Sequence, residues 1–235
     1  MDKDFISTVS HELRTPLTSI RGFSQTMLNS WDKLDDETKK RFLKIIEEQS
    51  NRLINLVENM LSVNKLQTEK ENLIYKESNL KLIIEPVISV VKNTYPTHKY
   101  IFEHNQNIPN ILVDRYKFQQ IMMNLIENAA KYSDDNSAIT IKTALCGNFA
   151  SIKVIDNGIG IDSENYEKIF TKFSRIDNPL TRKVQGSGLG LYITKNLVEK
   201  MDGKISVKSE NGQTTFEVLM PLKSVEDQAR AKCNQ

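Results

Sequence analysis

The sequence contains little cysteine. Its two cysteines, Cys146 and Cys233, lie far apart in the chain, and neither has the spacing to a histidine cluster that a zinc site needs. Two such residues also form no framework of disulfides. Their scarcity argues against a disulfide-stapled secreted domain and against a structural zinc domain, and it favours a reducing compartment.

The sequence also lacks a hydrophobic run long enough to cross a membrane. The longest run, 82–91, is interrupted by Glu85 and Pro86 and is well short of the roughly 18 residues that span a bilayer. A secretory signal peptide is missing too, because the charged residues 2–4 precede only a short mixed segment. We therefore expect a soluble chain without membrane contact.

Neither charge sign is in excess. The 32 basic and 30 acidic residues leave a formal net charge of +2, which gives no support for a nucleic-acid surface or an acidic partner. The composition is that of an ordinary soluble protein, and the length allows one large or two modest domains.

Two long amphipathic helices are predicted at the start of the chain. Apolar residues recur with helical spacing over 5–28 and again over 42–66, around a polar, acid-rich break at 29–37. Thr38 or Asp36 is predicted to cap the second helix. Because a lone hairpin buries its apolar stripes on one side only, we expect two copies to form a dimeric four-helix bundle. The alternative is that both helices pack on the rest of the same chain.

The pattern changes to shorter elements near residue 70. We expect a layer of helices on a mixed, largely antiparallel sheet, so that the whole chain is of the α+β class. The predicted boundaries are 1–69 for the hairpin, 70–222 for this second domain and 223–235 for a polar tail. The predicted strands cover 100–105, 138–144, 149–155, 204–209 and 214–220, and the predicted helices 79–94, 115–132, 163–169 and 190–201.

A histidine and a proline lie close together inside the first predicted helix. Pro16 removes one helical hydrogen bond and presses on the carbonyl of Glu12, which loosens the backbone just after His11. The sequence thus predicts a bend beside an exposed imidazole.

One face of the predicted helix 115–132 carries two amides and an ammonium group. Asn124, Asn128 and Lys131 recur at steps of four and three, which aligns them along that face. Amide oxygens suit a hard cation such as Mg²⁺, which keeps several waters and shares phosphate oxygens. Taken alone, the pattern also fits an ordinary solvated helix face.

A glycine turn follows the predicted strand 149–155. Gly158 and Gly160 allow a close backbone approach that a side chain would forbid. Asp156, at the start of this turn, can accept a hydrogen bond from an exocyclic amine such as that of adenine. A plain tight turn is the alternative.

A second glycine-rich segment, 186–191, opens the predicted helix 190–201. Free backbone amides and the positive end of the helix dipole favour phosphate there. The spacing matches neither a Walker loop nor a dinucleotide-binding turn, so we expect a phosphate site of another architecture.

The segment between the two glycine turns has few apolar residues apart from Phe170 and Phe173. It is typical of a mobile flap, and its Arg175, Arg182 and Lys183 could reach a terminal phosphate when that flap closes. A solvated basic loop is the alternative.

Together and in this order, these segments resemble the kinase core of bacterial two-component sensor histidine kinases, over residues 5–222. The segment around His11 resembles the H box of that family, 124–132 its N box, 156–161 its G1 box, 170–173 its F box and 186–191 its G2 box.

The resemblance implies a dimerisation and histidine-phosphotransfer domain over 1–69. His11 would then be the phosphoacceptor, and Glu12 would hydrogen-bond its imidazole and raise its nucleophilicity. Thr15 lies one turn after His11, where its hydroxyl could position a water that dephosphorylates a partner.

The resemblance also implies an ATP-binding domain over 70–222, an α/β sandwich of the fold shared with Hsp90, MutL and gyrase. Asn128 would ligate Mg²⁺, and Asn124 would support the metal and the phosphates. Asp156 would select adenine, and Arg175 would steady the charge at the γ-phosphate. The other residues expected at the nucleotide are Lys131, Tyr132, Gly158, Gly160, Phe170, Phe173, Gly186, Gly188, Leu189 and Gly190.

The activity implied is ATP-dependent autophosphorylation of His11, followed by transfer to an aspartate on the receiver domain of a response regulator, with phosphatase action on that regulator. A homodimer is expected, located in the cytoplasm or forming the cytoplasmic core of a longer, membrane-anchored sensor. The alternatives are a non-catalytic dimeric scaffold and a nucleotide-hydrolysing clamp. Gyrase-like clamps place a water-activating glutamate where this chain has Asn124, and an amide cannot take a proton.

Overall fold

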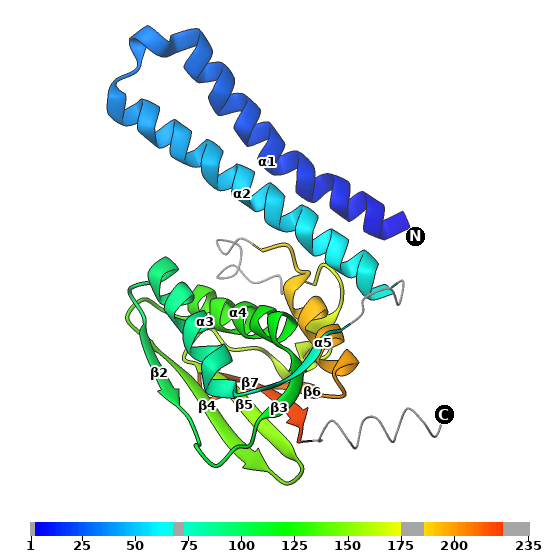
Figure 1. Ribbon diagram of the computed structural model, residues 1–235. Helices are drawn as coiled ribbons and strands as arrows, with labels where there is room; N and C mark the ends of the chain where they lie inside the picture. The colour runs from blue at the N-terminus through cyan, green and yellow to red at the C-terminus, as the bar shows by residue number, and fades with distance from the viewer. Residues whose placement is uncertain (1–2, 68–72, 175–185, 223–235) are drawn as a thin grey trace. The chain divides into compact units, whose positions relative to one another are not determined.

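The computed structural model describes residues 3–67, 73–174 and 186–222 (Figure 1). The chain divides into two compact units between residues 67 and 68. In the part of the chain that is described, no helix is both long enough and apolar enough to cross a membrane.

The first unit is a helical hairpin of α1 (Lys3–Ser30) and α2 (Asp36–Gln67), with a short 3₁₀ turn, η1 (Trp31–Lys33), between them. The Phe23 and Phe42 rings pack across the hairpin with centroids 4.9 Å apart. The expected proline lies inside α1, where Pro16 is buried. Both predicted helices are thus present.

The residue that caps α2 differs from the prediction of Thr38 or Asp36. Asp35, just before the helix, accepts the Thr38 backbone N–H on its Oδ1 at 2.6 Å, and this bond holds the pKa of Asp35 below its usual value. Since a cap must lie outside the first helical residue, Asp36 and Thr38 are one and three positions too late.

The second unit is an α/β sandwich. Its five-stranded sheet has the order β2-β4-β5-β7-β6, in which only the β2–β4 pair is parallel. Helices α3, α4 and α5 cover one face of this sheet (Figure 1). The sheet strands are β2 (Lys99–Glu103), β4 (Ala138–Cys146), β5 (Phe149–Asp156), β6 (Lys204–Glu210) and β7 (Gln213–Pro221), and the helices α3 (Leu80–Thr94), α4 (Arg115–Tyr132) and α5 (Gly190–Lys200). The predicted mixed, largely antiparallel sheet is confirmed.

Two short strands escaped prediction. β1 (Tyr75–Ser78) and β3 (Ile111–Asp114) pair with each other outside the main sheet. Asp114 joins them to α4, because its Oδ1 accepts the Tyr116 and Lys117 backbone N–H groups at 3.1 Å and its Oδ2 accepts the Ile74 N–H at 2.9 Å.

The predicted helix 163–169 is wrong as a continuous α-helix. The segment forms two 3₁₀ turns, η2 (Ser163–Asn165) and η3 (Lys168–Phe170). Between them the Tyr166 hydroxyl donates to the Ser209 carbonyl at 3.1 Å and accepts the Ser209 N–H at 2.6 Å. These bonds tie the middle of the segment to β6.

The core of the second unit lies between the helices and the sheet. It is built mainly from one face of α4 and the inward-facing residues of β4, β5 and β7, which all have almost no exposed surface. Its largest members include Phe118, Ile121, Met122, Leu125, Ile126, Ile139, Ile141 and Ile152. This packing fixes α4 against β5, and the two elements end beside each other.

Candidate functional site

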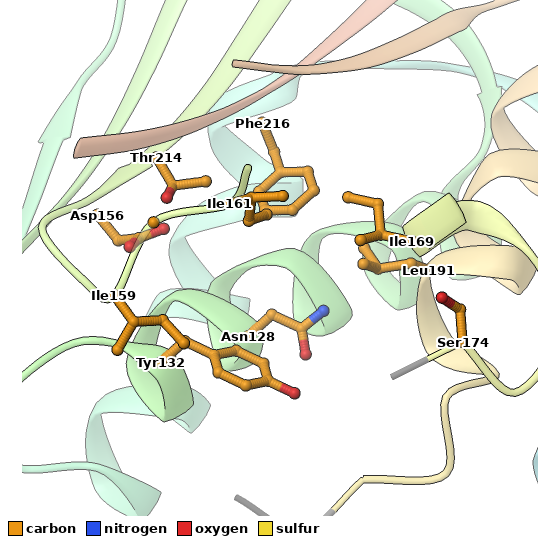
Figure 2. A pocket seen from close by; sticks show the side chains of 11 residues that line it. Asn128, Tyr132, Asp156, Ile159, Ile161, Ile169, Ser174, Leu191, Thr214 and Phe216 are labelled. Carbon is orange, nitrogen blue, oxygen red and sulfur yellow. The ribbon is translucent and has the colours of Figure 1, made fainter. Parts of the chain in front are cut away.

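A pocket opens at this end of the second unit (Figure 2). Its walls come from the last turns of α4, the loop after β5, η3, the first turn of α5 and the start of β7. The lining residues are Asn128, Tyr132, Asp156, Ile159, Gly160, Ile161, Ile169, Ser174, Leu191, Thr214 and Phe216. Most of the wall is apolar, so a few polar groups dominate its chemistry.

A buried carboxyl group lies at one side of the pocket. Asp156 is the last residue of β5 and is only 4% exposed. Burial raises its pKa to about 7, and hydrogen bonds from the Gly158 backbone and the Ser133 side chain oppose that rise. Thr214 faces Asp156 across the β5–β7 ladder, and the two side chains lie together in Figure 2. The pair offers a carboxyl and a hydroxyl at the edge of an apolar slot.

The turn after Asp156 requires glycine. A Cβ at Gly158 would collide with the Tyr132 carbonyl oxygen and lie 2.8 Å from Oδ1 of Asp156. The next residue, Ile159, donates its N–H to the same Tyr132 carbonyl at 3.2 Å. The glycine turn is therefore pinned to the end of α4, which brings Asp156 and Tyr132 to one pocket.

Only part of the predicted polar face of α4 reaches this pocket. Of that face, Asn128 lines the pocket, and Figure 2 shows its amide between the carboxyl end and the Ser174 end. Tyr132, which the family resemblance implied at the nucleotide, lines the pocket as well. Lys131 instead forms an ion pair with Glu127 at 2.9 Å. Burial lowers the pKa of Lys131, but the charge and hydrogen bond of Glu127, together with Tyr95 and Tyr132, raise it more, so the net pKa is above its usual value.

Asn124 contacts α5 rather than the pocket lining. Its side-chain amide donates to the Thr194 hydroxyl at 2.8 Å. A Cβ at Gly190 would collide with the Asn124 Oδ1 and lie 3.0 Å from its Cγ. The face of α4 that the sequence predicted is thus divided between the pocket and α5.

The segment after η3 supplies one wall. The buried Phe170 ring packs edge-on against Phe216 at 6.5 Å. Gly188 has a φ of +67°, and a Cβ there would lie 2.7 Å from the Phe173 carbonyl carbon. The predicted segment 170–173 therefore contacts the second glycine-rich segment, 186–191. The predicted residues Arg175, Arg182 and Lys183 lie outside the described residues.

The remaining glycine-segment residues differ in their surroundings. Leu189 is fully buried just before α5, while a Cβ at Gly186 would meet open space. Gly160, with a φ of +75°, lines the pocket.

Several lining residues were missed from the sequence. Thr214 and Phe216 belong to β7, and Ile161, Ile169, Ser174 and Leu191 lie near the predicted motifs without being part of their chemistry. The alternation of β7 would have placed Thr214 and Phe216 on one face. Nothing in the sequence, however, says that this face borders a pocket.

The predicted nucleophile lies in the other unit. His11 is exposed on α1, and the Thr15 hydroxyl donates to its backbone carbonyl at 3.4 Å. Glu12 forms an ion pair with Arg52 of α2 at 3.3 Å. This pair ties the backbone next to His11 to the second helix, and a hydrogen bond from Glu12 to the imidazole stays a prediction.

Two family models match the chain. Residues 1–69 match the His Kinase A phospho-acceptor domain, and residues 113–224 match the histidine kinase-, DNA gyrase B- and HSP90-like ATPase domain. The first match contains His11 and the second contains the pocket.

Curated relatives agree with these matches. The signal transduction histidine-protein kinase ArlS of Staphylococcus haemolyticus is 34% identical over 218 residues, which cover 92% of this chain and 48% of ArlS. The sensor protein kinase WalK of Staphylococcus saprophyticus is 34% identical over 228 residues, or 96% of this chain and 37% of WalK. The chain thus spans half or less of the length of these relatives.

Solved structures show the same fold. Histidine kinase ThkA, in its complex with response regulator protein TrrA, aligns with a TM-score of 0.75 at 27% identity, over 94% of this chain and 62% of that one. Acinetobacter baumannii histidine kinase AdeS aligns with a TM-score of 0.71 at 22% identity, over 91% of this chain and 98% of that one, which concerns the fold alone. Both domain matches fit the structure, which has an exposed histidine on a helical hairpin and a pocket in the second unit. The chain belongs to the sensor histidine kinases, of which it carries the phospho-acceptor and ATPase domains.

Proposed function

We propose that the chain autophosphorylates His11 with ATP and passes the phosphoryl group to an aspartate of a response-regulator receiver domain. The observation that carries this proposal is the pocket, in which one buried carboxyl group and one amide lie at separate places along an apolar slot. Such a slot suits a purine base joined to a phosphate chain.

The adenine of ATP fits the Asp156 side of the pocket. The carboxylate of Asp156 accepts a hydrogen bond from the exocyclic amine, and Ile159, Ile161 and Phe216 contact the faces of the ring. The phosphates then extend past Asn128 towards the glycine-rich start of α5, where free backbone N–H groups favour anions.

Asn128 is suited to bind Mg²⁺, although the protein would supply few of the ligands of the ion. Among the described residues, no three histidine, cysteine, aspartate or glutamate side chains cluster. The Asn128 amide oxygen is a suitable hard ligand, and Mg²⁺ commonly takes its other oxygens from water and phosphates. When bound, the ion would neutralise phosphate charge, while Asn128 holds its place beside the pocket.

The transfer itself needs an imidazole nitrogen with a free lone pair. That nitrogen of His11 attacks the γ-phosphorus, the new P–N bond forms, and the bond from the γ-phosphorus to the bridging oxygen breaks so that ADP leaves. Glu12 is proposed to accept a hydrogen bond from the other ring nitrogen, and Arg175 to steady the charge at the γ-phosphate.

A homodimer is supported by the surface of the hairpin. Large apolar side chains remain at least 45% exposed on both helices, namely Leu17, Leu28, Leu43, Ile54, Val57 and Leu61. Covering such stripes with a second hairpin gives the four-helix bundle. We further propose that this dimer works in the cytoplasm, where ATP and response regulators are available.

Labelling with γ-labelled ATP tests the kinase activity. We expect protein-bound label that is lost in acid and kept in alkali, and that disappears in His11→Gln. Label that persists in His11→Gln contradicts the phosphoacceptor. A protein that binds ATP without acquiring label is a scaffold, and rapid phosphate release without label indicates a hydrolysing clamp.

Phosphatase action on the regulator is proposed to depend on Thr15. Its hydroxyl lies one turn from the exposed His11, where it can position a water. Thr15→Ala is expected to keep autophosphorylation and to slow dephosphorylation of the phosphorylated regulator. Loss of both activities together would assign Thr15 a structural role.

A further inference from the structure

We propose that Asn124 is a positioning residue that holds the start of α5 against α4, through Thr194 and Gly190, and so sets the position of the glycine-rich segment at the nucleotide. The inference rests on the nucleotide binding proposed above. It differs from the direct role at the metal and phosphates that the family resemblance implies for Asn124.

Both ends of the Asn124 amide are directed at α5. The amide nitrogen donates to the Thr194 hydroxyl at 2.8 Å, and the amide oxygen lies where a Cβ of Gly190 would have to be. Gly190 and Thr194 are four residues apart and therefore lie on one face of α5. One side chain of α4 thus contacts two successive turns of α5.

The contact is closed to solvent on the α5 side. Thr194 is 1% exposed, and its neighbours Ile193, Leu197 and Val198 are buried as well. A buried hydroxyl or amide that loses its partner carries a desolvation penalty of about 1–3 kcal/mol. Sliding or rotating α5 along α4 would break this hydrogen bond, so the desolvation penalty opposes such a movement.

The position of α5 matters for the pocket because its first turn and the segment before it form one wall. Leu191 lines the pocket, and Gly188 packs against the Phe173 backbone. A shift of α5 would move both contacts. Asn124 therefore acts on the nucleotide through α5, without having to touch it.

Thr194→Val tests the inference, because it keeps the shape of the side chain and removes the acceptor. We expect ADP to bind about five- to tenfold more weakly to this variant by calorimetry, the equivalent of one buried hydrogen bond. Thr194→Ser keeps the hydroxyl and should bind ADP as the original chain does. Asn124→Ala combined with Thr194→Val should bind no more weakly than Asn124→Ala alone, because both remove one interaction.

A matched control separates positioning from stability. Thr143 is another buried threonine, whose hydroxyl accepts the Asn105 N–H at 3.1 Å, away from the pocket lining. Thr143→Val should lower the melting temperature with unchanged ADP affinity. Equal losses of affinity in Thr143→Val and Thr194→Val overturn the inference, as does normal binding in Thr194→Val when Asn124→Ala binds poorly. If the unaltered chain does not bind ADP at all, the proposed function itself fails.

Discussion

Asp156 combines deep burial with a carboxyl group that titrates close to neutrality. Its pKa is raised from 3.8 to about 7, chiefly by burial. In the folded protein the carboxylate is therefore the costly form, and the proton is bound more tightly than in the unfolded chain. Stability therefore falls as pH rises from about 4 to about 7, because the unfolded chain ionises first. Ionisation of Asp156 in the folded protein follows near pH 7, and it creates the charged acceptor for the proposed adenine contact.

This balance predicts a pH-dependent nucleotide affinity. As pH rises from 6 to 8, Asp156 ionises and ADP should bind more tightly. Asp156→Asn should bind about tenfold more weakly at pH 8, because a hydrogen bond to a charged acceptor is lost. Calorimetry of both proteins across this pH range checks the prediction. The ADP phosphates titrate in both experiments, so a difference between the two pH profiles comes from Asp156. An identical pH profile in both proteins would contradict the role of Asp156.

Lys131 carries a positive charge one residue before Tyr132, which lines the pocket. Its ion pair with Glu127 is about one-third exposed on each side and should contribute less than about 1 kcal/mol to stability. We expect Lys131→Met to melt near the original temperature and to bind ADP about fivefold more weakly, because it removes a positive charge one residue before the pocket residue Tyr132. Glu127→Gln serves as the comparison and should bind ADP at least as tightly as the unaltered chain. Weaker binding in Glu127→Gln would mean that Lys131 must be held by the carboxylate.

At the start of α2, two neighbouring aspartates can be compared as helix caps. Asp35 accepts the Thr38 N–H, whereas the solvent-exposed carboxylate of Asp36 forms an ion pair with Lys39 at 3.3 Å. Asp35→Ala should therefore lower the melting temperature of the hairpin more than Asp36→Ala. Because the pKa of Asp35 is lowered, its contribution should fade as pH falls through that pKa. Equal effects of the two substitutions on thermal melting would argue against the cap.

The long helices could be predicted from the sequence, whereas the shortest strands could not. Strong helical periodicity predicted α1, α2 and α4 closely. Of the three residues that the spacing along α4 placed on one face, Asn128 lines the pocket, while Asn124 contacts α5 and Lys131 pairs with Glu127. The strands β1 and β3 have four residues each, too few for a periodic signal, and they form only because they pair with each other. Phe216 was missed for a different reason, because its strand was predicted but its place beside the pocket depends on the sheet register.

For the whole molecule, the exposed apolar stripes of the hairpin predict its oligomeric state. Leu61→Asp, at a side chain that is 54% exposed on α2, should convert a dimer into a monomer in light scattering, because it places charge inside the four-helix bundle. Leu82→Asp is the control, since Leu82 is 63% exposed on α3 in the other unit and should leave the dimer intact. Dissociation by both substitutions, or by neither, would contradict a dimer built on the hairpin.

The carboxylate of Asp114 has a mechanical consequence for a molecule of two units. It holds the Ile74 N–H near the start of the second unit and the first turn of α4, while β1 makes its ladder only with β3. A pull on the chain ahead of β1 is therefore transmitted first to the root of α4, the helix that carries Asn128, before it loads the five-stranded sheet.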